Sequence, residues 1–114
     1  MRSVLYEAKR EGNELGEIGF LLTYMGKYAN EREQFGRPIS KYGAIRYKIA
    51  EQAIRSFAVE SALYRASQNI EDATNAFIEG GMDKIQATLK GIEEFAAECA
   101  VLKVAGSECL DYVV

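Results

Sequence analysis

The chain contains no histidine among its 114 residues, and this absence removes several classes of enzyme. A serine or cysteine nucleophile that is activated by histidine cannot be assembled within it. The di-iron sites of helical bundles, which use a Glu-x-x-His motif, are excluded in their usual form. Any functional site in this chain must therefore be built from other side chains.

Cysteine is almost as scarce. The two cysteines, Cys99 and Cys109, lie ten residues apart in what the pattern predicts to be one helix, where the rise separates them by about 15 Å. They cannot form a disulfide with each other at that distance. Alanine, glycine and aliphatic residues surround both, so we expect them to be small packing groups.

Long apolar runs and an excess of basic residues are also missing. No run approaches the roughly 20 apolar residues of a membrane span, and no signal peptide follows Met1. The net charge is −3 and the two signs are interleaved, which argues against a nucleic-acid groove or a basic membrane surface. We expect an intracellular protein with no transmembrane segment and no nucleic-acid partner.

Apolar residues that recur with the helical period are the main feature that is present. They predict helices that begin at Leu15, at Ser40 and near Asp83, the second of which ends near Glu71. The predicted fold class is all-α, an up-down bundle of three long antiparallel helices. With 48% apolar residues in one small domain, some apolar surface needs a partner, because such domains bury only about two-thirds of their unfolded surface.

Each predicted helix has an apolar side. The first carries two adjoining stripes, which are Leu15, Ile18, Leu22, Met25 and Ala29, and Phe20, Leu21, Tyr24 and Tyr28. The second has an inner side made of Ile45, Ile49, Ala53, Phe57 and Leu63. The third has a stripe of Ile85, Leu89, Ile92, Ala96, Cys99, Leu102, Gly106 and Val113. These sides predict the core.

Glycine interrupts the pattern in two places. Gly16, Gly19 and Gly26 lie inside the first helix, where each costs about 1 kcal/mol relative to alanine; they indicate either close approach of another backbone or ligand, or loose packing. The stretch DATNAFIEGGM, residues 72–82, is predicted to be a loop with a short helical turn. The apolar end of the chain suggests that it was cut inside a larger protein.

The stretch YANEREQFGRPIS, residues 28–40, separates the first two helices. Gly36 supplies backbone freedom, and Pro38, the only proline in the chain, fixes φ and removes a hydrogen-bond donor. Ser40 is placed to accept N–H groups at the first turn of the next helix. This stretch therefore predicts a defined corner.

The corner gathers Arg32, Gln34, Phe35 and Arg37 within six residues. The planar donors of arginine match phosphate or carboxylate, the amide both donates and accepts, and the phenyl ring offers a stacking face. These residues suit an anionic, flat-faced ligand. The alternative is that Arg32 pairs with a neighbouring glutamate while Phe35 fills the core beneath the turn.

The pattern Tyr-Ala-x-Glu-Arg-x-Gln-Phe-Gly-x-Pro-Ile-Ser resembles the C-terminal helical domain of the acyl-CoA dehydrogenases. The resemblance continues through residues 42–50, through FAVESALYR at 57–65, and through AAECAVLKVAGSECLDYVV at 96–114. It implies that residues 15–114 form that domain, truncated before the last of its four helices. Residues 1–14 match poorly and are expected to be an arm or a short helix.

The resemblance also implies a function. Members of the family carry out α,β-dehydrogenation of fatty acyl-CoA thioesters, in which a carboxylate removes the α-proton and FAD takes the β-hydride. The corner of one subunit normally reaches the pyrophosphate and adenosine of the neighbouring subunit's FAD. The matching positions predict cofactor-binding roles for Arg32, Gln34, Phe35, Tyr42 and Gly43. No catalytic residue and no metal ligand is assigned.

The partners implied by the resemblance are an acyl-CoA substrate, an electron-transfer acceptor and further copies of the chain in a homodimer or homotetramer. The parent enzyme is expected in fatty acid β-oxidation, in the cytoplasm or, in a eukaryote, in the mitochondrial matrix. The isolated chain is expected to be inactive and not to retain FAD alone. An alternative from a different class is a noncatalytic helical assembly or protein-interaction module.

Overall fold

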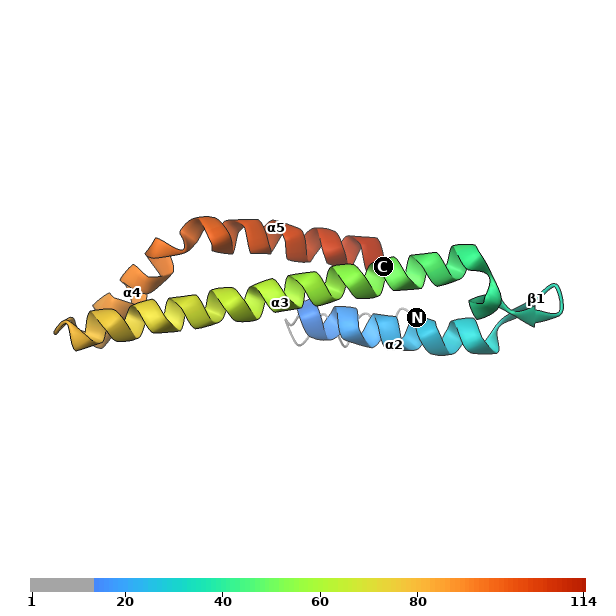
Figure 1. Ribbon diagram of the computed structural model, residues 1–114, viewed down its shortest axis with the longest axis horizontal. Helices are drawn as coiled ribbons and strands as arrows, with labels where there is room; N and C mark the ends of the chain where they lie inside the picture. Colours follow the sequence, from blue (N-terminus) through green and yellow to red (C-terminus); the bar gives the residue numbers. More distant parts are fainter. Residues whose placement is uncertain (1–13) are drawn as a thin grey trace. The chain divides into compact units, whose positions relative to one another are not determined.

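Helices account for most of the chain that the computed structural model describes, which is residues 14–114. The elements are α2 (Glu14–Glu31), β1 (Glu33–Gln34), β2 (Arg37–Pro38), the 3₁₀ helix η1 (Ile39–Lys41), α3 (Gly43–Glu79), α4 (Lys84–Glu94) and α5 (Ala96–Val113) (Figure 1). The predicted all-α class is confirmed. The predicted N-terminal arm lies outside the described residues, except for its last residue.

The described chain forms two compact units, to both of which α3 and α5 contribute. One unit comprises residues 14–58 together with Gly106–Val114, and the other comprises Val59–Ala105. The core of the first unit is made by buried residues of α2 and α5, namely Ile18, Leu21, Ala29, Cys109 and Val113. The second unit buries Ala66 of α3 and Ala87 of α4.

The two stripes predicted for α2 are buried to different extents. Ile18 and Ala29 of the first stripe are buried, as is Leu21 of the second. The aromatic residues Phe20, Tyr24 and Tyr28 remain exposed. Of the two explanations offered for the helix glycines, close approach is not seen at Gly19 or Gly26, where an added Cβ would have no neighbour within 4 Å among the described residues.

α3 begins later than the sequence predicted. Ser40 lies inside η1 rather than at the start of α3, and its buried Oγ has no hydrogen-bond partner among the described residues. The first turn of α3 is instead joined to η1 by backbone bonds: the Tyr42 N–H donates to the Ile39 carbonyl at 3.1 Å, and the Arg46 N–H donates to the Tyr42 carbonyl at 3.0 Å. The predicted serine cap is therefore wrong.

α3 also ends later than predicted, because the expected loop at residues 72–79 is helical. The helix ends where Gly81 adopts φ +91°. The Gly81 N–H donates to the Ile78 carbonyl at 2.9 Å, and the Met82 N–H donates to the Phe77 carbonyl at 3.1 Å. This pair of bonds is the Schellman motif. The Gly-Gly pair ends the helix, whereas the polar residues before it do not.

The third predicted helix is two helices, which meet at Phe95. Asp83 caps α4 as predicted, because its carboxylate accepts a bond from the Ile85 N–H at 3.2 Å. Gly91 of α4 lies against α3, where an added Cβ would contact the Thr74 side chain and would lie 3.2 Å from the Ile70 carbonyl.

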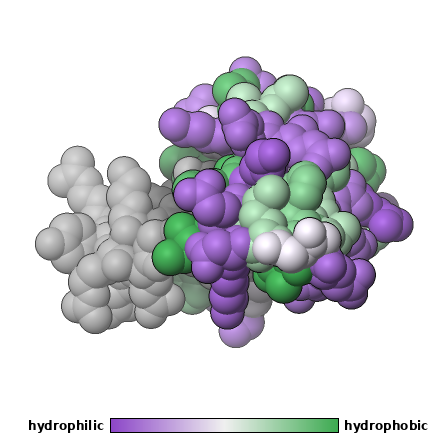
Figure 2. Space-filling view, turned by 90° about the vertical axis from the view of Figure 1, so that its left-hand side faces the viewer, coloured by the Kyte–Doolittle hydropathy of each residue, from purple (hydrophilic) through white to green (hydrophobic). Residues whose placement is uncertain are grey.

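The aliphatic stripe predicted for the core side of α4 is exposed to solvent, so this part of the predicted core is wrong. Ile85, Leu89 and Ile92 are exposed, whereas the small residues Ala87 and Gly91 are buried. α4 therefore packs through its small residues, which permit close approach of another helix. Seen from the end that carries the α3–α4 turn, hydrophobic residues lie exposed among hydrophilic ones (Figure 2).

The end of α5 is attached to α3 within the first unit. Gln52, which is 5% exposed, donates from Nε2 to the Val113 carbonyl at 3.4 Å, while its Oε1 has no partner among the described residues. The Arg55 guanidinium lies 3.8 Å from the centre of the Tyr112 ring and also bonds to Glu51. Polar and aromatic contacts thus supplement a small apolar core.

Candidate functional site

The corner between α2 and α3 is a β-hairpin with a two-residue loop. β1 and β2 are antiparallel, with Gln34 paired with Arg37 and Glu33 paired with Pro38. The tip residues Phe35 and Gly36 have φ of 52° and 79°. Positive φ at both central residues is the signature of a type I′ turn. The hairpin projects beyond the end of α2 in Figure 1.

Phe35 is an unusual occupant of the first tip position. Type I′ turns favour asparagine, aspartate or glycine there, and a bulky residue with positive φ is a conformational outlier. Its side chain gains nothing from the core of this chain, because the residue is 94% exposed. An exposed phenyl ring in a strained backbone conformation is typical of a contact with another molecule.

Hydrogen bonds fix the base of the hairpin. The Arg32 N–H donates to the Tyr28 carbonyl at 2.8 Å, and the Ile39 N–H donates to the Arg32 carbonyl at 2.8 Å. These bonds connect α2 to the hairpin and the hairpin to η1. The backbone at Arg32 is therefore well defined, so the position from which its side chain projects is set.

Tyr42 supports the hairpin from the segment between η1 and α3. Its hydroxyl donates to the Gln34 carbonyl at 2.7 Å. The Arg37 guanidinium lies over its ring, 4.1 Å from the centroid. Tyr42 thus contacts both strands of the hairpin.

The polar side chains of the hairpin face solvent. Arg32, Gln34 and Arg37 are exposed, and within the described part of the chain Arg32 makes no ion pair with Glu31 or Glu33. The alternative interpretation, in which a neighbouring glutamate neutralises Arg32 and Phe35 fills the core, is therefore wrong. The hairpin presents two guanidinium groups, an amide and a phenyl ring without using the side chains of Arg32, Gln34 or Phe35 in its own packing.

Gly43 is the first residue of α3 and is exposed. A Cβ built on it would meet nothing within 4 Å. The first amides of a helix lack intrahelical acceptors and carry partial positive charge. Open space beside Gly43 therefore leaves a weakly positive helix end exposed, six residues along the chain from Arg37 and eleven from Arg32.

All five residues predicted to bind a cofactor lie in this one segment, but they occupy different layers. Arg32, Gln34 and Phe35 are on the exposed hairpin, while Tyr42 lies beneath it and Gly43 begins the next helix. Arg37 belongs with the first group, although it was not among the five. The sequence placed Arg37 in the corner cluster, and the register of the hairpin pairs it with Gln34.

The hairpin residues fit the diphosphate and adenosine end of FAD. A guanidinium that has no carboxylate partner can bind phosphate through two parallel hydrogen bonds. An exposed phenyl ring can pack on an adenine or ribose face. Among residues 14–114 no group of three or more acidic or cysteine side chains is placed to hold a metal ion.

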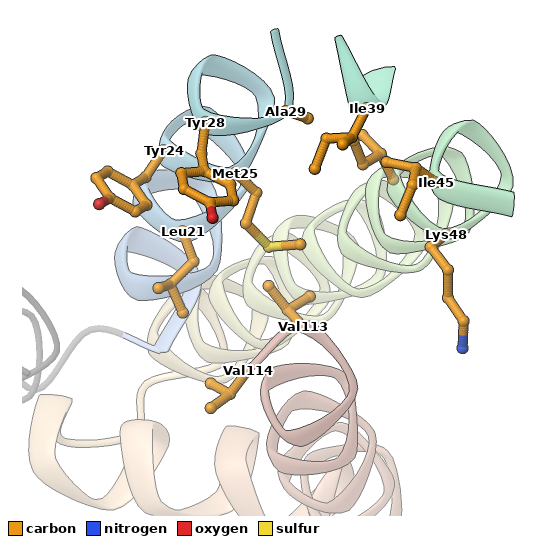
Figure 3. A pocket seen from close by; sticks show the side chains of 11 residues that line it. Leu21, Tyr24, Met25, Tyr28, Ala29, Ile39, Ile45, Lys48, Val113 and Val114 are labelled. Carbon is orange, nitrogen blue, oxygen red and sulfur yellow. The ribbon is translucent and has the colours of Figure 1, made fainter. Parts of the chain in front are cut away.

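A second feature of the same unit is an apolar cavity of about 400 Å³. Figure 3 shows side chains from α2, η1, α3 and the end of α5 around it. Its lining consists of Leu21, Tyr24, Met25, Tyr28, Ala29, Ile39, Ile45, Lys48, Ile49, Val113 and Val114. No aspartate or glutamate is among these lining residues, so they offer no side-chain carboxylate that could remove a proton from carbon.

Comparison with known proteins identifies the same family from a family profile and from individual relatives. The profile of the family described as "Acyl-CoA dehydrogenase, C-terminal domain" matches residues 12–114. Over 87 residues the chain is 40% identical to a probable acyl-CoA dehydrogenase of Bacillus subtilis, an alignment that covers 76% of this chain and 15% of that protein.

Two further relatives carry the names of reductases. The chain is 35% identical over 75 residues to a 3-(aryl)acrylate reductase of Clostridium sporogenes, which is 66% of this chain and 18% of that protein. It is 37% identical over 62 residues to the caffeyl-CoA reductase-Etf complex subunit CarC of Acetobacterium woodii, which is 54% of this chain and 16% of that protein. The chain thus spans less than a fifth of these curated relatives.

Proposed function

The chain belongs to the acyl-CoA dehydrogenase family, and on that basis we propose that it contributes to a flavin-dependent enzyme acting on fatty acyl-CoA thioesters. Its part is the oligomer-forming helical domain and one portion of the FAD site. The observation that carries the proposal is the exposed hairpin, in which Arg32, Gln34 and Phe35 have no side-chain partner within the described chain.

The proposed roles follow from the chemistry of each group. Arg32 binds the diphosphate, because a guanidinium offers paired donors to phosphate oxygens. Gln34 donates a hydrogen bond to the adenosine part or accepts one from it, and the ring of Phe35 packs against the adenosine. Tyr42 and Gly43 lie at the edge of the same site. When bound, FAD supplies the redox chemistry by accepting hydride from the acyl chain. No catalytic residue is assigned to this chain.

The proposed partners are an acyl-CoA substrate, an electron-transfer acceptor and further copies of the chain. One relative is named as a subunit of an Etf complex, which supports an acceptor of that kind. A homodimer or homotetramer brings the hairpin of one copy to the FAD of another. We place the enzyme in the cytoplasm, or in the mitochondrial matrix if the source is a eukaryote. No helix among the described residues is long and apolar enough to cross a membrane.

The test compares two arginines in the protein expressed from its full gene. Arg32→Ala should cause most of the flavin to be lost during purification, because a charge-assisted contact to phosphate is removed. Arg55→Ala is the control: Arg55 stacks on Tyr112 and pairs with Glu51, so its loss should lower the melting temperature slightly and leave flavin content unchanged. Flavin absorbance per mole of protein and thermal unfolding measure the two effects.

Equal flavin content in the two variants, with both folded, would contradict the proposed role of the hairpin. A full-length protein that binds no flavin at all would instead favour the noncatalytic assembly module. That second candidate is supported by exposed apolar residues on α3, which include Tyr47, Ile54 and Phe57.

A further inference from the structure

The hairpin needs restraint to hold its conformation. Phe35 has φ of 52°, a region that a bulky side chain avoids, and its exposed ring makes no compensating contact with the core. Without outside support, the segment would relax toward conformations in which Phe35 leaves the left-handed region. The directions of the Arg32 and Phe35 side chains would then vary.

Tyr42 supplies the support at the carbonyl that precedes Phe35. Its hydroxyl donates to the Gln34 carbonyl at 2.7 Å, a short bond between groups eight residues apart in sequence. A bond to this carbonyl restrains the peptide plane between Gln34 and Phe35, and therefore restrains rotation into the tip. The ring of the same residue carries the Arg37 guanidinium at 4.1 Å from its centroid.

We infer that Tyr42 is a positioning residue for the anion site: it holds the hairpin in the shape in which Arg32 and Phe35 meet a phosphate-bearing ligand. It acts through the hairpin and not by touching the ligand, because its hydroxyl is bound to the Gln34 carbonyl and its ring is covered by Arg37. This inference rests on the proposed function and replaces a direct cofactor contact at Tyr42 with an indirect one.

The structure contains a matched control, which is another tyrosine whose hydroxyl makes an exposed hydrogen bond. Tyr64 is an exposed tyrosine of α3 whose hydroxyl bonds to the Glu60 carboxylate at 3.3 Å. It belongs to the second unit, whereas the hairpin belongs to the first. Tyr64→Phe therefore removes the same atom from a similar exposed hydrogen bond, without affecting the proposed site.

The experiment uses the protein expressed from its full gene. The bound flavin is removed, and FAD is then titrated back to measure its affinity. Tyr42→Phe keeps the ring and loses the hydroxyl, and should weaken FAD binding about fivefold, the effect of losing one hydrogen bond. Tyr64→Phe should leave the affinity unchanged. Amide hydrogen exchange at Gln34 and Arg37, the pair next to the turn, should accelerate in Tyr42→Phe alone.

A double-mutant cycle separates positioning from a general loss of stability. In an Arg32→Ala background, Tyr42→Phe should weaken FAD binding by clearly less than fivefold, because one of the two groups that it positions is already gone. Fully additive effects would overturn the inference, and so would an unchanged affinity of Tyr42→Phe while Arg32→Ala binds weakly. An unchanged affinity of Arg32→Ala would instead overturn the proposed function itself.

Discussion

At the scale of single residues, Phe35 at the tip of the hairpin is a residue that we expect to serve ligand binding and not the stability of the fold. Phe35 is 94% exposed and has φ of 52°, so it contributes strain and no core packing. Strain of this kind costs on the order of 1–3 kcal/mol. The residue that best fits the backbone at this position is asparagine, which adopts the left-handed region easily.

Phe35→Asn is therefore expected to stabilise the isolated chain by about 1 kcal/mol, since the strain is relieved and no buried contact is lost. The same substitution should weaken FAD binding in the full-length protein, because the stacking ring is removed. Urea unfolding of the chain and flavin titration of the full-length protein measure the two effects. A loss of stability together with unchanged flavin affinity would mean that Phe35 serves the fold.

At the scale of elements, the packing of α4 on α3 depends on small residues. Gly91 lies so close to α3 that an added Cβ would contact the Thr74 side chain and the Ile70 carbonyl. The larger residues Ile85 and Leu89 remain exposed. A carbonyl belongs to the backbone and cannot rotate away as a side chain can, so the helices would have to move apart.

Gly91→Ala should destabilise the chain by about 1–3 kcal/mol, although alanine is the better helix former, because overpacking forces the backbones of α3 and α4 apart. Gly26→Ala in α2 is the matched control. No atom lies within 4 Å of its added Cβ, and it should stabilise the chain by up to about 1 kcal/mol. Chemical denaturation followed by circular dichroism tests both. Similar stabilisation by the two changes would contradict the packing described for α4.

At the scale of the whole molecule, apolar surface on α3 points to association between copies. Tyr47, Ile54 and Phe57 are 64%, 62% and 73% exposed. Their spacing of seven and three residues places them on one side of the helix. A small domain with a row of large apolar residues in water gains stability when another surface covers them.

Ile54→Glu together with Phe57→Glu is expected to convert an oligomer of the chain into a monomer, because two charges would have to be buried at the interface. Ser67→Glu adds a charge at an exposed polar position of the same helix and should leave the mass unchanged. Light scattering after size-exclusion chromatography measures the mass. If the unsubstituted chain is a monomer at the highest attainable concentration, the prediction that copies associate through α3 is wrong.

Prediction from sequence succeeded where local chemistry dominates. The helical period and the cap at Asp83 both depend on residues within one or two turns of one another. The corner was recognised for the same reason, since a proline, a glycine and clustered arginines are visible in a short stretch. The two-residue hairpin within it was missed, because phenylalanine is an unexpected first residue for a type I′ turn.

Prediction failed where burial depends on how closely two helices pack. The sequence ranks Ile85 and Leu89 above Ala87 and Gly91 as core residues, yet the smaller pair is buried. The full length of α3 was missed for a related reason. Polar residues at 72–79 weaken the apolar pattern without breaking the backbone, and the helix continues to the first glycines that terminate it.

By itself, the sequence determined that this chain is helical, that it has a corner rich in arginine after its first helix, and that it resembles one family of enzymes. The tertiary structure alone decided which faces are buried and which side chains of the corner remain available. Helix formation depends on neighbours along the chain, whereas burial depends on which backbone can approach most closely. The exposure of Arg32 and Phe35 is of the second kind, because it depends on the placement of a hairpin to which Tyr42 bonds from eight residues beyond Gln34.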